Sequence, residues 1–293
     1  MVTVVDRGRI TCALASDPDR QIVAVKAREL GRKAAVVGDQ VMLHGDLSGR
    51  SDTLARLVAI ETRTHELRRT ADDRDTAERV IVANADQLGI VVAAADPPPR
   101  AGLIDRCLVA AFDAGVRPFL VITKPDLGQT ADLTSMCMDL GLPAFVVTRG
   151  EELRALRDEL TGSTTVLVGH SGVGKSTLVN ALIPGADRST GVVNSVTGRG
   201  RHTSTSVRAL VLPGGGWIID TPGVRSFGLA HVDRDRVVQA FDDLAGGIAD
   251  CPRGCRHVDT HCGLDAWVSQ GHADPNRLSS LRRILFALDA PDE

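Results

Sequence analysis

The sequence contains no tyrosine, and residues 1–75 contain no phenylalanine or tryptophan either. For that part of the chain, this absence excludes base stacking on aromatic side chains, the usual way in which small β-barrels hold single-stranded nucleic acid. Any RNA contact there must use phosphate groups, shape and loops. The basic candidates, each with a purely structural role as an equal alternative, are Arg32, Lys33, Arg63, Arg68 and Arg69.

Long hydrophobic runs and a charge excess are also missing. No stretch of eighteen apolar residues occurs, and the first ten residues carry charges where a signal peptide would have its apolar core. The formal net charge is only -3, so nucleic-acid contacts must come from local basic patches and not from a global positive field. We therefore expect a soluble, cytoplasmic protein without membrane attachment.

The N-terminal part of the chain has the pattern of a small β-structure. Short apolar runs bounded by turn residues occur at 8–14, 21–25 and 34–43. Runs of this length and spacing predict a small barrel. Residues 65–78 are charged and show no periodicity, so we interpret them as a linker or loop.

From residue 87 onward apolar runs alternate with helical stretches, which is typical of a mostly parallel sheet covered by helices. After residue 227 the pattern becomes mainly helical. A length of 293 residues fits two or three domains. We predict an OB-like β-barrel at 1–68, an α/β domain at 69–228 and a helical domain at 229–293.

A glycine-rich loop joins an apolar strand at 165–168 to a helical stretch at 178–183. Its pattern, Gly-x4-Gly-Lys-Ser, predicts a P-loop, in which backbone N–H groups bind a β-phosphate at a helix N-terminus. Lys175 is expected to neutralise the β- and γ-phosphates, and Ser176 to bind Mg²⁺. The predicted phosphate-binding residues are Gly169, His170, Ser171, Gly172, Val173, Gly174, Lys175, Ser176 and Thr177.

Thr123-Lys124-Pro125-Asp126 follows another apolar strand and resembles the guanine-reading motif of GTPases, usually written Asn-Lys-x-Asp. The Asp126 carboxylate can accept hydrogen bonds from N1–H and the exocyclic amino group of guanine, a pattern that adenine does not offer. Lys124 is expected to lay its aliphatic stem along the base. Thr123 departs from the usual asparagine, but its hydroxyl can still bridge to the neighbouring loop.

Asp220-Thr221-Pro222-Gly223 matches the Asp-x-x-Gly motif that follows a strand in GTPases. Asp220 is expected to hold Mg²⁺ through water and the Gly223 amide to contact the γ-phosphate. A Gly- and Arg-rich stretch at 198–205 is interpreted as switch I. One of its hydroxyls should complete the Mg²⁺ shell; we favour Thr203, with Ser204 and Thr205 as alternatives.

The base-reading motif precedes the P-loop, whereas an ordinary GTPase begins with the P-loop. In this order the chain resembles the circularly permuted GTPases. Together with the N-terminal barrel, Gly-His-Ser-Gly-Val-Gly-Lys-Ser, Gly-Arg-Gly-Arg-His-Thr and a C-terminal Cys/His cluster, it resembles the ribosome small-subunit-dependent GTPase A family. The resemblance implies GTP hydrolysis stimulated by the small ribosomal subunit, a role in late maturation of that subunit, and contact with its rRNA. We expect the chain to act as a monomer.

The residue after Asp-x-x-Gly is Val224, where Ras-like enzymes have the glutamine that orients the attacking water. Because valine cannot hydrogen-bond to water, slow intrinsic hydrolysis is expected, with a group from elsewhere completing the site. His202 in switch I is the candidate within the chain, and the resemblance implies a catalytic histidine there. The alternatives are an RNA-contacting basic loop around His202 and a ribosomal group that orients the water.

Three cysteines and a histidine cluster within a dozen residues, while Cys12, Cys107 and Cys137 lie in apolar surroundings and are expected to be core thiols. Thiolates and an imidazole at this spacing suit one closed, tetrahedral, structural Zn²⁺ site. His261 is a competing nitrogen ligand, and cysteines that are paired with one another or merely buried in helices are the alternative to metal binding. The predicted zinc ligands are Cys251, Cys255, His257 and Cys262.

Two other functions compete with that of a ribosome-assembly GTPase. One is an RNA-binding module that holds a structural, slowly turning-over guanine nucleotide; Lys175, Ser176, Asp220 and His202 argue against it. The other is a P-loop ATPase, which conflicts with the guanine-reading carboxylate.

Overall fold

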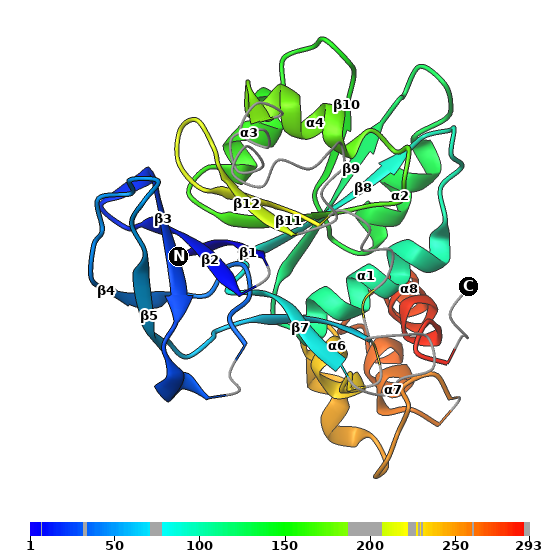
Figure 1. Ribbon diagram of the computed structural model, residues 1–293. Coiled ribbons are helices and arrows are strands. Elements are labelled where there is room, and N and C mark those ends of the chain that lie inside the picture. Colours follow the sequence, from blue (N-terminus) through cyan, green and yellow to red (C-terminus); the bar gives the residue numbers. More distant parts are fainter. Residues whose placement is uncertain are drawn as a thin grey trace.

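The computed structural model describes residues 1–6, 8–31, 34–70, 78–186, 207–221, 227, 229, 231–259 and 261–289. Three parts are visible in Figure 1: a β-structure formed by the N-terminal residues, a central sheet covered by helices, and a group of helices near the C-terminus. In the described part of the chain, every helix is too short or too polar to cross a lipid bilayer.

The N-terminal part consists of neighbouring strands in the order β1, β2, β3, β5, β4. Backbone hydrogen bonds from Val2 N to the Asp39 carbonyl (2.8 Å) and from Gly38 N to the Val2 carbonyl (2.9 Å) bring the segment before β4 back to β1. This return supports the predicted barrel. The elements are β1 (Val2–Asp6), β2 (Arg9–Leu14), β3 (Asp17–Lys26), η1 (Arg28–Leu30), β4 (Val41–His44) and β5 (Ala55–Ile60).

The interpretation of residues 65–78 as a linker or loop was wrong for residues 66–70 and 78, because β6 (Glu66–Thr70) pairs antiparallel with β7 (Glu78–Ala83). Residues 71–77 of that prediction lie outside the described residues. Leu67 of β6 is 1% exposed, and burial of this side chain holds the strand against the central core. The predicted boundary between residues 68 and 69 therefore falls inside a strand.

Two of the charges in the described part of this segment, Glu66 and Arg68, have partners. Arg63 binds the fully buried Asp39 through Nε (2.7 Å) and Nη2 (3.0 Å), and its Nη1 lies 3.2 Å from Glu66. Arg68 lies 2.6 Å from the other oxygen of Glu66. Burial tends to raise the pKa of Glu66, but the hydrogen bonds from both arginines outweigh it and lower that pKa. Two of the proposed RNA-contacting arginines thus have structural partners.

The central sheet is mostly parallel, as predicted: β10, β9, β8, β11 and β13 run in the same direction, and β12 is antiparallel to β13. Helices α1 and α2 lie on one face, and α3 and α4 on the other. The elements are β8 (Gln87–Ala93), α1 (Ala101–Asp113), β9 (Arg117–Thr123), α2 (Ala131–Asp139), β10 (Ala144–Val147), α3 (Arg154–Leu160), β11 (Thr164–Val168), α4 (Lys175–Leu182), β12 (Arg208–Val211) and β13 (Trp217–Asp220).

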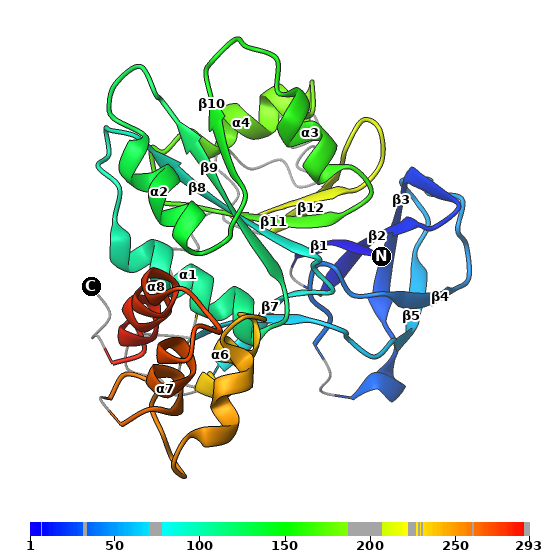
Figure 2. The same cartoon turned by 180° about the vertical axis from the view of Figure 1, so that it is seen from behind.

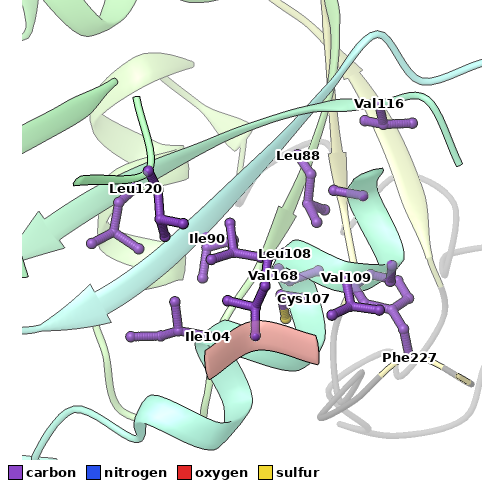
Figure 3. Close-up of a cluster of buried hydrophobic side chains, with 14 of the residues drawn as sticks. Leu88, Ile90, Ile104, Cys107, Leu108, Val109, Val116, Leu120, Val168 and Phe227 are labelled. Atoms are coloured by element: carbon purple, nitrogen blue, oxygen red, sulfur yellow. The ribbon is translucent and has the colours of Figure 1, made fainter. Parts of the chain in front are cut away.

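Alternation along β8 explains why both faces of the sheet are covered. Ile90 packs with the α1 side chains Ile104 and Leu108, as Figure 3 shows, whereas Val91 belongs to the cluster beneath α3 and α4. Successive strand residues point to opposite faces, so a continuous apolar strand requires cover on both sides.

The C-terminal helices pack against α1 on the side away from the sheet, as Figures 1 and 2 show. An ion pair between Arg283 of α8 and Asp105 of α1 ties the two helices together. Burial raises the pKa of Asp105, and Arg283 counteracts this effect. The mainly helical prediction for this region is confirmed by α6 (Arg234–Gln239), η2 (Ala245–Asp250), α7 (Gly263–Ser269) and α8 (Pro275–Phe286).

The N-terminal strands and the central strands form one continuous 11-stranded sheet, because β1 pairs antiparallel with β12 at Val4 and Arg208. The sequence patterns predicted neither β1 nor β12. Their pairing places the N-terminal part next to the strand that precedes β13, and thereby next to the edge where the predicted motifs lie.

Candidate functional site

The carboxyl ends of the parallel strands meet at one edge of the central sheet, which is where ligands bind in open α/β sheets. Thr123 ends β9 and is aligned with Ala93 of β8. On β11, Leu167 is aligned with Asp220 of β13. The base-reading motif, the P-loop and the start of the Asp-x-x-Gly motif therefore share this edge, although they lie far apart in the sequence.

The loop between β11 and α4 has the backbone of a phosphate-binding turn. Gly172 and Gly174 have positive φ angles of 86° and 92°, which side chains rarely tolerate. A Cβ on Gly169 would lie 2.4 Å from the Val91 carbonyl oxygen, so only glycine fits against β8. Buried Leu178 anchors α4, whose first turn leaves Ser176 exposed at the edge of the sheet. Ser171, Thr177 and His170 are also partly or fully accessible, and Val173 is buried.

Thr123 connects the base-reading strand to the P-loop. Its side chain is buried, and its hydroxyl lies 2.5 Å from the carbonyl oxygen of Val173 and 3.1 Å from that of Val92. A hydroxyl donates one proton, so the shorter contact to Val173 is the principal hydrogen bond. The bridge expected in place of the usual asparagine is therefore present, and it fixes the P-loop relative to the guanine-reading residues.

Replacing Thr123 with valine should weaken GTP binding by about 5- to 30-fold, because the buried Val173 carbonyl loses its donor at a cost of about 1–2 kcal/mol. Fluorescence titration with a labelled guanine nucleotide measures the change. Thr123→Ser keeps the hydroxyl and is the control. Equal affinities for the valine variant and the wild-type chain would show that this bridge does not organise the nucleotide site.

Lys124 and Asp126 extend beyond the sheet edge. Lys124 has a positive φ of 51°, and its ammonium donates a hydrogen bond to the Asp96 carbonyl oxygen in the loop after β8. Asp126 is exposed. Its carboxylate is thus accessible to a base placed over this edge.

Lys175 forms an ion pair with Asp220. The P-loop lysine therefore lies next to the carboxylate that is predicted to hold Mg²⁺ through water. Their side chains are only 12% and 23% exposed, so water screens the pair weakly. Thr221 next to Asp220 is buried and donates a hydrogen bond to the Leu167 carbonyl (2.8 Å). This contact ties the chain just beyond β13 to β11.

The remaining predicted residues of the nucleotide site, His202, Thr203 and Gly223, lie outside the described residues, as do Ser204, Thr205 and Val224. The described part of the predicted site therefore comprises the proposed guanine-reading residues, the P-loop and Asp220.

Two loops at this edge were missed in the sequence. One follows β8: a Cβ on Gly172 would lie 3.6 Å from Pro97, and Lys124 binds the preceding Asp96. The other follows β10 and begins at Thr148, next to Val147, which is aligned with Thr123. The signal for both was a turn-forming segment, Asp-Pro-Pro-Pro or Thr-Arg-Gly, directly after an apolar strand.

A second site lies among the C-terminal helices. The side-chain ligand atoms of Cys251, Cys255, His257 and Cys262 all lie within 4.8 Å of one another. The sulfurs of Cys251 and Cys262 are 3.7 Å apart, and His257 Nδ1 lies 3.5 Å and 3.6 Å from them. A tetrahedral zinc ion with metal–sulfur bonds of about 2.3 Å and a metal–nitrogen bond of about 2.0–2.1 Å requires separations of about 3.8 and 3.5 Å. The three pairs among Cys251, His257 and Cys262 therefore have the separations of zinc ligands, and the Cys255 sulfur lies within 4.8 Å of the other three ligand atoms.

Without a cation the thiols of this cluster favour the neutral, protonated form. Burial raises the pKa of Cys262 to about 12 and raises the pKa of Cys251. A bound Zn²⁺ stabilises the thiolates and so counteracts the rise in the pKa of these cysteines. In contrast, the isolated thiols Cys12, Cys107 and Cys137 are buried in apolar clusters, as predicted for core residues.

The chain is similar to known proteins along most of its length. The family model described as RsgA GTPase matches residues 60–230. Two curated relatives are named small ribosomal subunit biogenesis GTPase RsgA. The one from Ectopseudomonas mendocina is 39% identical over 88% of this chain and 76% of its own. The one from Pseudomonas aeruginosa is 39% identical over 88% and 77%.

Solved structures support the same fold. YjeQ from Thermotoga maritima superposes with a TM-score of 0.68 at 22% identity, covering 98% of this chain and 97% of that one. YloQ, described as a circularly permuted GTPase, gives 0.68 at 23% identity, covering 98% and 94%. The order of the motifs, their meeting at one sheet edge and the similarity to the curated relatives agree with one another. This chain belongs to the RsgA GTPase family.

Proposed function

We propose that this protein hydrolyses GTP during late maturation of the small ribosomal subunit, and that the subunit stimulates its hydrolysis. The carrying observation is that Asp126, Lys175 and Asp220 meet at one sheet edge although the base-reading motif precedes the P-loop. Family membership and the names of the curated relatives support the GTPase activity and the role in subunit biogenesis.

In this proposal the Lys175–Asp220 ion pair opens when nucleotide enters. Lys175 then neutralises the β- and γ-phosphates, while Asp220 holds the water shell of Mg²⁺. When bound, Mg²⁺ would supply positive charge to neutralise the charge that develops on the transferred phosphoryl group. Ser176 is the direct Mg²⁺ ligand, and Asp126 with Lys124 selects guanine. In this proposal every described motif has a role in nucleotide binding or in phosphoryl transfer.

The switch residues complete the proposed site. Thr203 adds its hydroxyl to the Mg²⁺ shell, and the Gly223 amide contacts the γ-phosphate. His202 orients the attacking water, since Val224 cannot. A ribosomal group acting on the water is the alternative, and the two arrangements differ in whether His202 is required.

Contact with rRNA is proposed for the barrel and for the C-terminal zinc module, with the chain acting as a monomer. Arg69 stays a candidate for phosphate contact, since Arg63 and Arg68 already bind carboxylates. Arg32 and Lys33 also stay candidates and lie outside the described residues. Cys251, Cys255, His257 and Cys262 are proposed to hold one structural Zn²⁺, which closes the loop between η2 and α7. We retain the three proposed domains, with the first boundary near the hairpin of β6 and β7.

Phosphate release measured with and without purified small subunits tests the proposal. Hydrolysis should be slow without the subunit and at least about tenfold faster with it. An added positioning or acid–base group typically contributes about 10²–10⁴-fold to the rate. His202→Ala should remove the accelerated part and leave nucleotide affinity nearly unchanged. Equal rates with and without subunits would contradict stimulation, and an unaffected His202→Ala variant would favour the ribosomal group.

An RNA-binding module with a structural nucleotide is the second candidate. It predicts that a single bound GTP is retained or hydrolysed once per chain. Multiple turnover under excess GTP distinguishes the two, and the accessible nucleotide edge with Ser176 and Asp126 exposed favours turnover.

A further inference from the structure

His257 faces two different partners with its two ring nitrogens. Nδ1 lies 3.5 Å and 3.6 Å from the sulfurs of Cys251 and Cys262, and Nε2 lies 2.6 Å from a carboxylate oxygen of Asp235. Asp235 belongs to α6, outside the segment that carries the four proposed ligands. We propose that Asp235 is the positioning residue that orients His257 as a zinc ligand. This inference rests on the proposed zinc site.

The chemistry of the two groups fixes the orientation. An ionised carboxylate only accepts hydrogen bonds, so Nε2 must carry the proton in the contact with Asp235. In the neutral ring Nδ1 is then left with its lone pair directed at the two sulfurs, which is the tautomer that binds a metal. Hydrogen bonding of Nε2–H to a carboxylate also makes Nδ1 a stronger donor toward the metal.

The backbone of His257 is held separately from its ring. Its φ of 61° is unusual for a residue with a side chain, and its carbonyl accepts a hydrogen bond from Arg282 Nε (3.1 Å). Arg282 is fixed in turn by Asp265, at 2.8 and 2.7 Å from its two oxygens. The main chain of His257 is thus held without Asp235. The specific effect of Asp235 is therefore on the orientation of the His257 ring.

Asp235 is itself held by the helix that carries it. Asp233 caps α6 by accepting a hydrogen bond from the Asp235 amide (2.9 Å). The neighbouring Arg234 binds Asp289 (2.7 Å) beyond α8. The Asp235 side chain is 54% exposed whereas the His257 side chain is 1% exposed, so the carboxylate contacts the ring from the solvent side. Solvent water reaches the carboxylate far more readily than the ring.

The experiment uses the full-length chain with zinc bound, and compares Asp235→Ala, Asp235→Asn and wild type. Competition with a colorimetric chelator measures zinc affinity and release. Because loss of a hydrogen-bonded partner of a metal-ligating histidine costs about 10–100-fold in metal affinity, we expect a loss in that range for Asp235→Ala. Asp235→Asn keeps an acceptor oxygen and should lose less. Asp242→Asn, an exposed aspartate just beyond α6, is the charge-matched control and should bind zinc like wild type.

A spectroscopic signature separates positioning from general stabilisation. In the zinc-loaded wild type, ¹⁵N-labelled histidine should show a downfield, slowly exchanging Nε2 proton for His257, and Asp235→Ala should lose it. A lower melting temperature with unchanged zinc affinity and an unchanged Nε2 signal would overturn the inference and make Asp235 a purely structural partner. Wild-type protein without stoichiometric zinc would instead overturn the zinc site itself. If Asp235→Ala does not fold, Asp235→Asn replaces it in the comparison, with a smaller expected loss of zinc affinity.

Discussion

Asp126→Asn should lower GTP affinity by at least about 100-fold and allow xanthosine triphosphate to bind in its place. The wild-type carboxylate can accept from both N1–H and the 2-amino group of guanine, and hydrogen bonds to a charged group contribute about 1.5–3 kcal/mol each. The asparagine amide group would oppose the 2-amino group with a donor of its own. Xanthine has a carbonyl oxygen at that position, which accepts from the asparagine. Competition of both nucleotides against a labelled guanine nucleotide measures the exchange.

Asp132→Asn is the matched control, since this exposed aspartate lies in the first turn of α2 shortly after the motif. It should keep the affinity for GTP. Because Asp126 is exposed and outside the apolar clusters, its variant should also keep the melting temperature of the wild type. An Asp126→Asn variant that still prefers GTP would place base recognition elsewhere on the sheet edge.

Lys175→Ala is expected to reduce kcat for GTP hydrolysis by about 10²–10³-fold, the effect of removing one preorganised group that stabilises charge in a transition state. The lysine is 12% exposed beside the P-loop glycines, where its charge is screened less than at an open surface. In the nucleotide-free chain its loss leaves Asp220 without this partner. Single-turnover hydrolysis at saturating GTP and Mg²⁺ measures the chemical step apart from binding.

Lys26→Ala removes the same charge from the end of β3, where the ammonium binds the Gly31 carbonyl (2.9 Å), and serves as the control. It should hydrolyse GTP at the wild-type rate. A Lys175→Ala variant with undiminished single-turnover hydrolysis would argue that the P-loop only binds nucleotide and that the rate is set by other groups.

Several parts of the molecule could be predicted from local pattern. The P-loop was recognisable because its glycines, lysine and serine act within one strand–loop–helix unit, and the structure forms that unit with Gly172 and Gly174 at positive φ. The alternating strands and helices of the centre were recognisable for the same reason. The strand at residues 66–70 was missed because a single buried Leu67 among charges gives almost no periodicity.

The sequence by itself determined the motifs, their permuted order and the Cys/His spacing, because each depends on residues close together in the chain. Only the tertiary structure decided which distant groups meet. It joined β1 to β12, placed Thr123 against Val173 and brought Asp235 of α6 to His257. The partner of each of these elements cannot be read from the element's own sequence. Strand pairing uses backbone groups that every residue has. An aspartate on a helix can bind any histidine that packing brings within hydrogen-bonding distance.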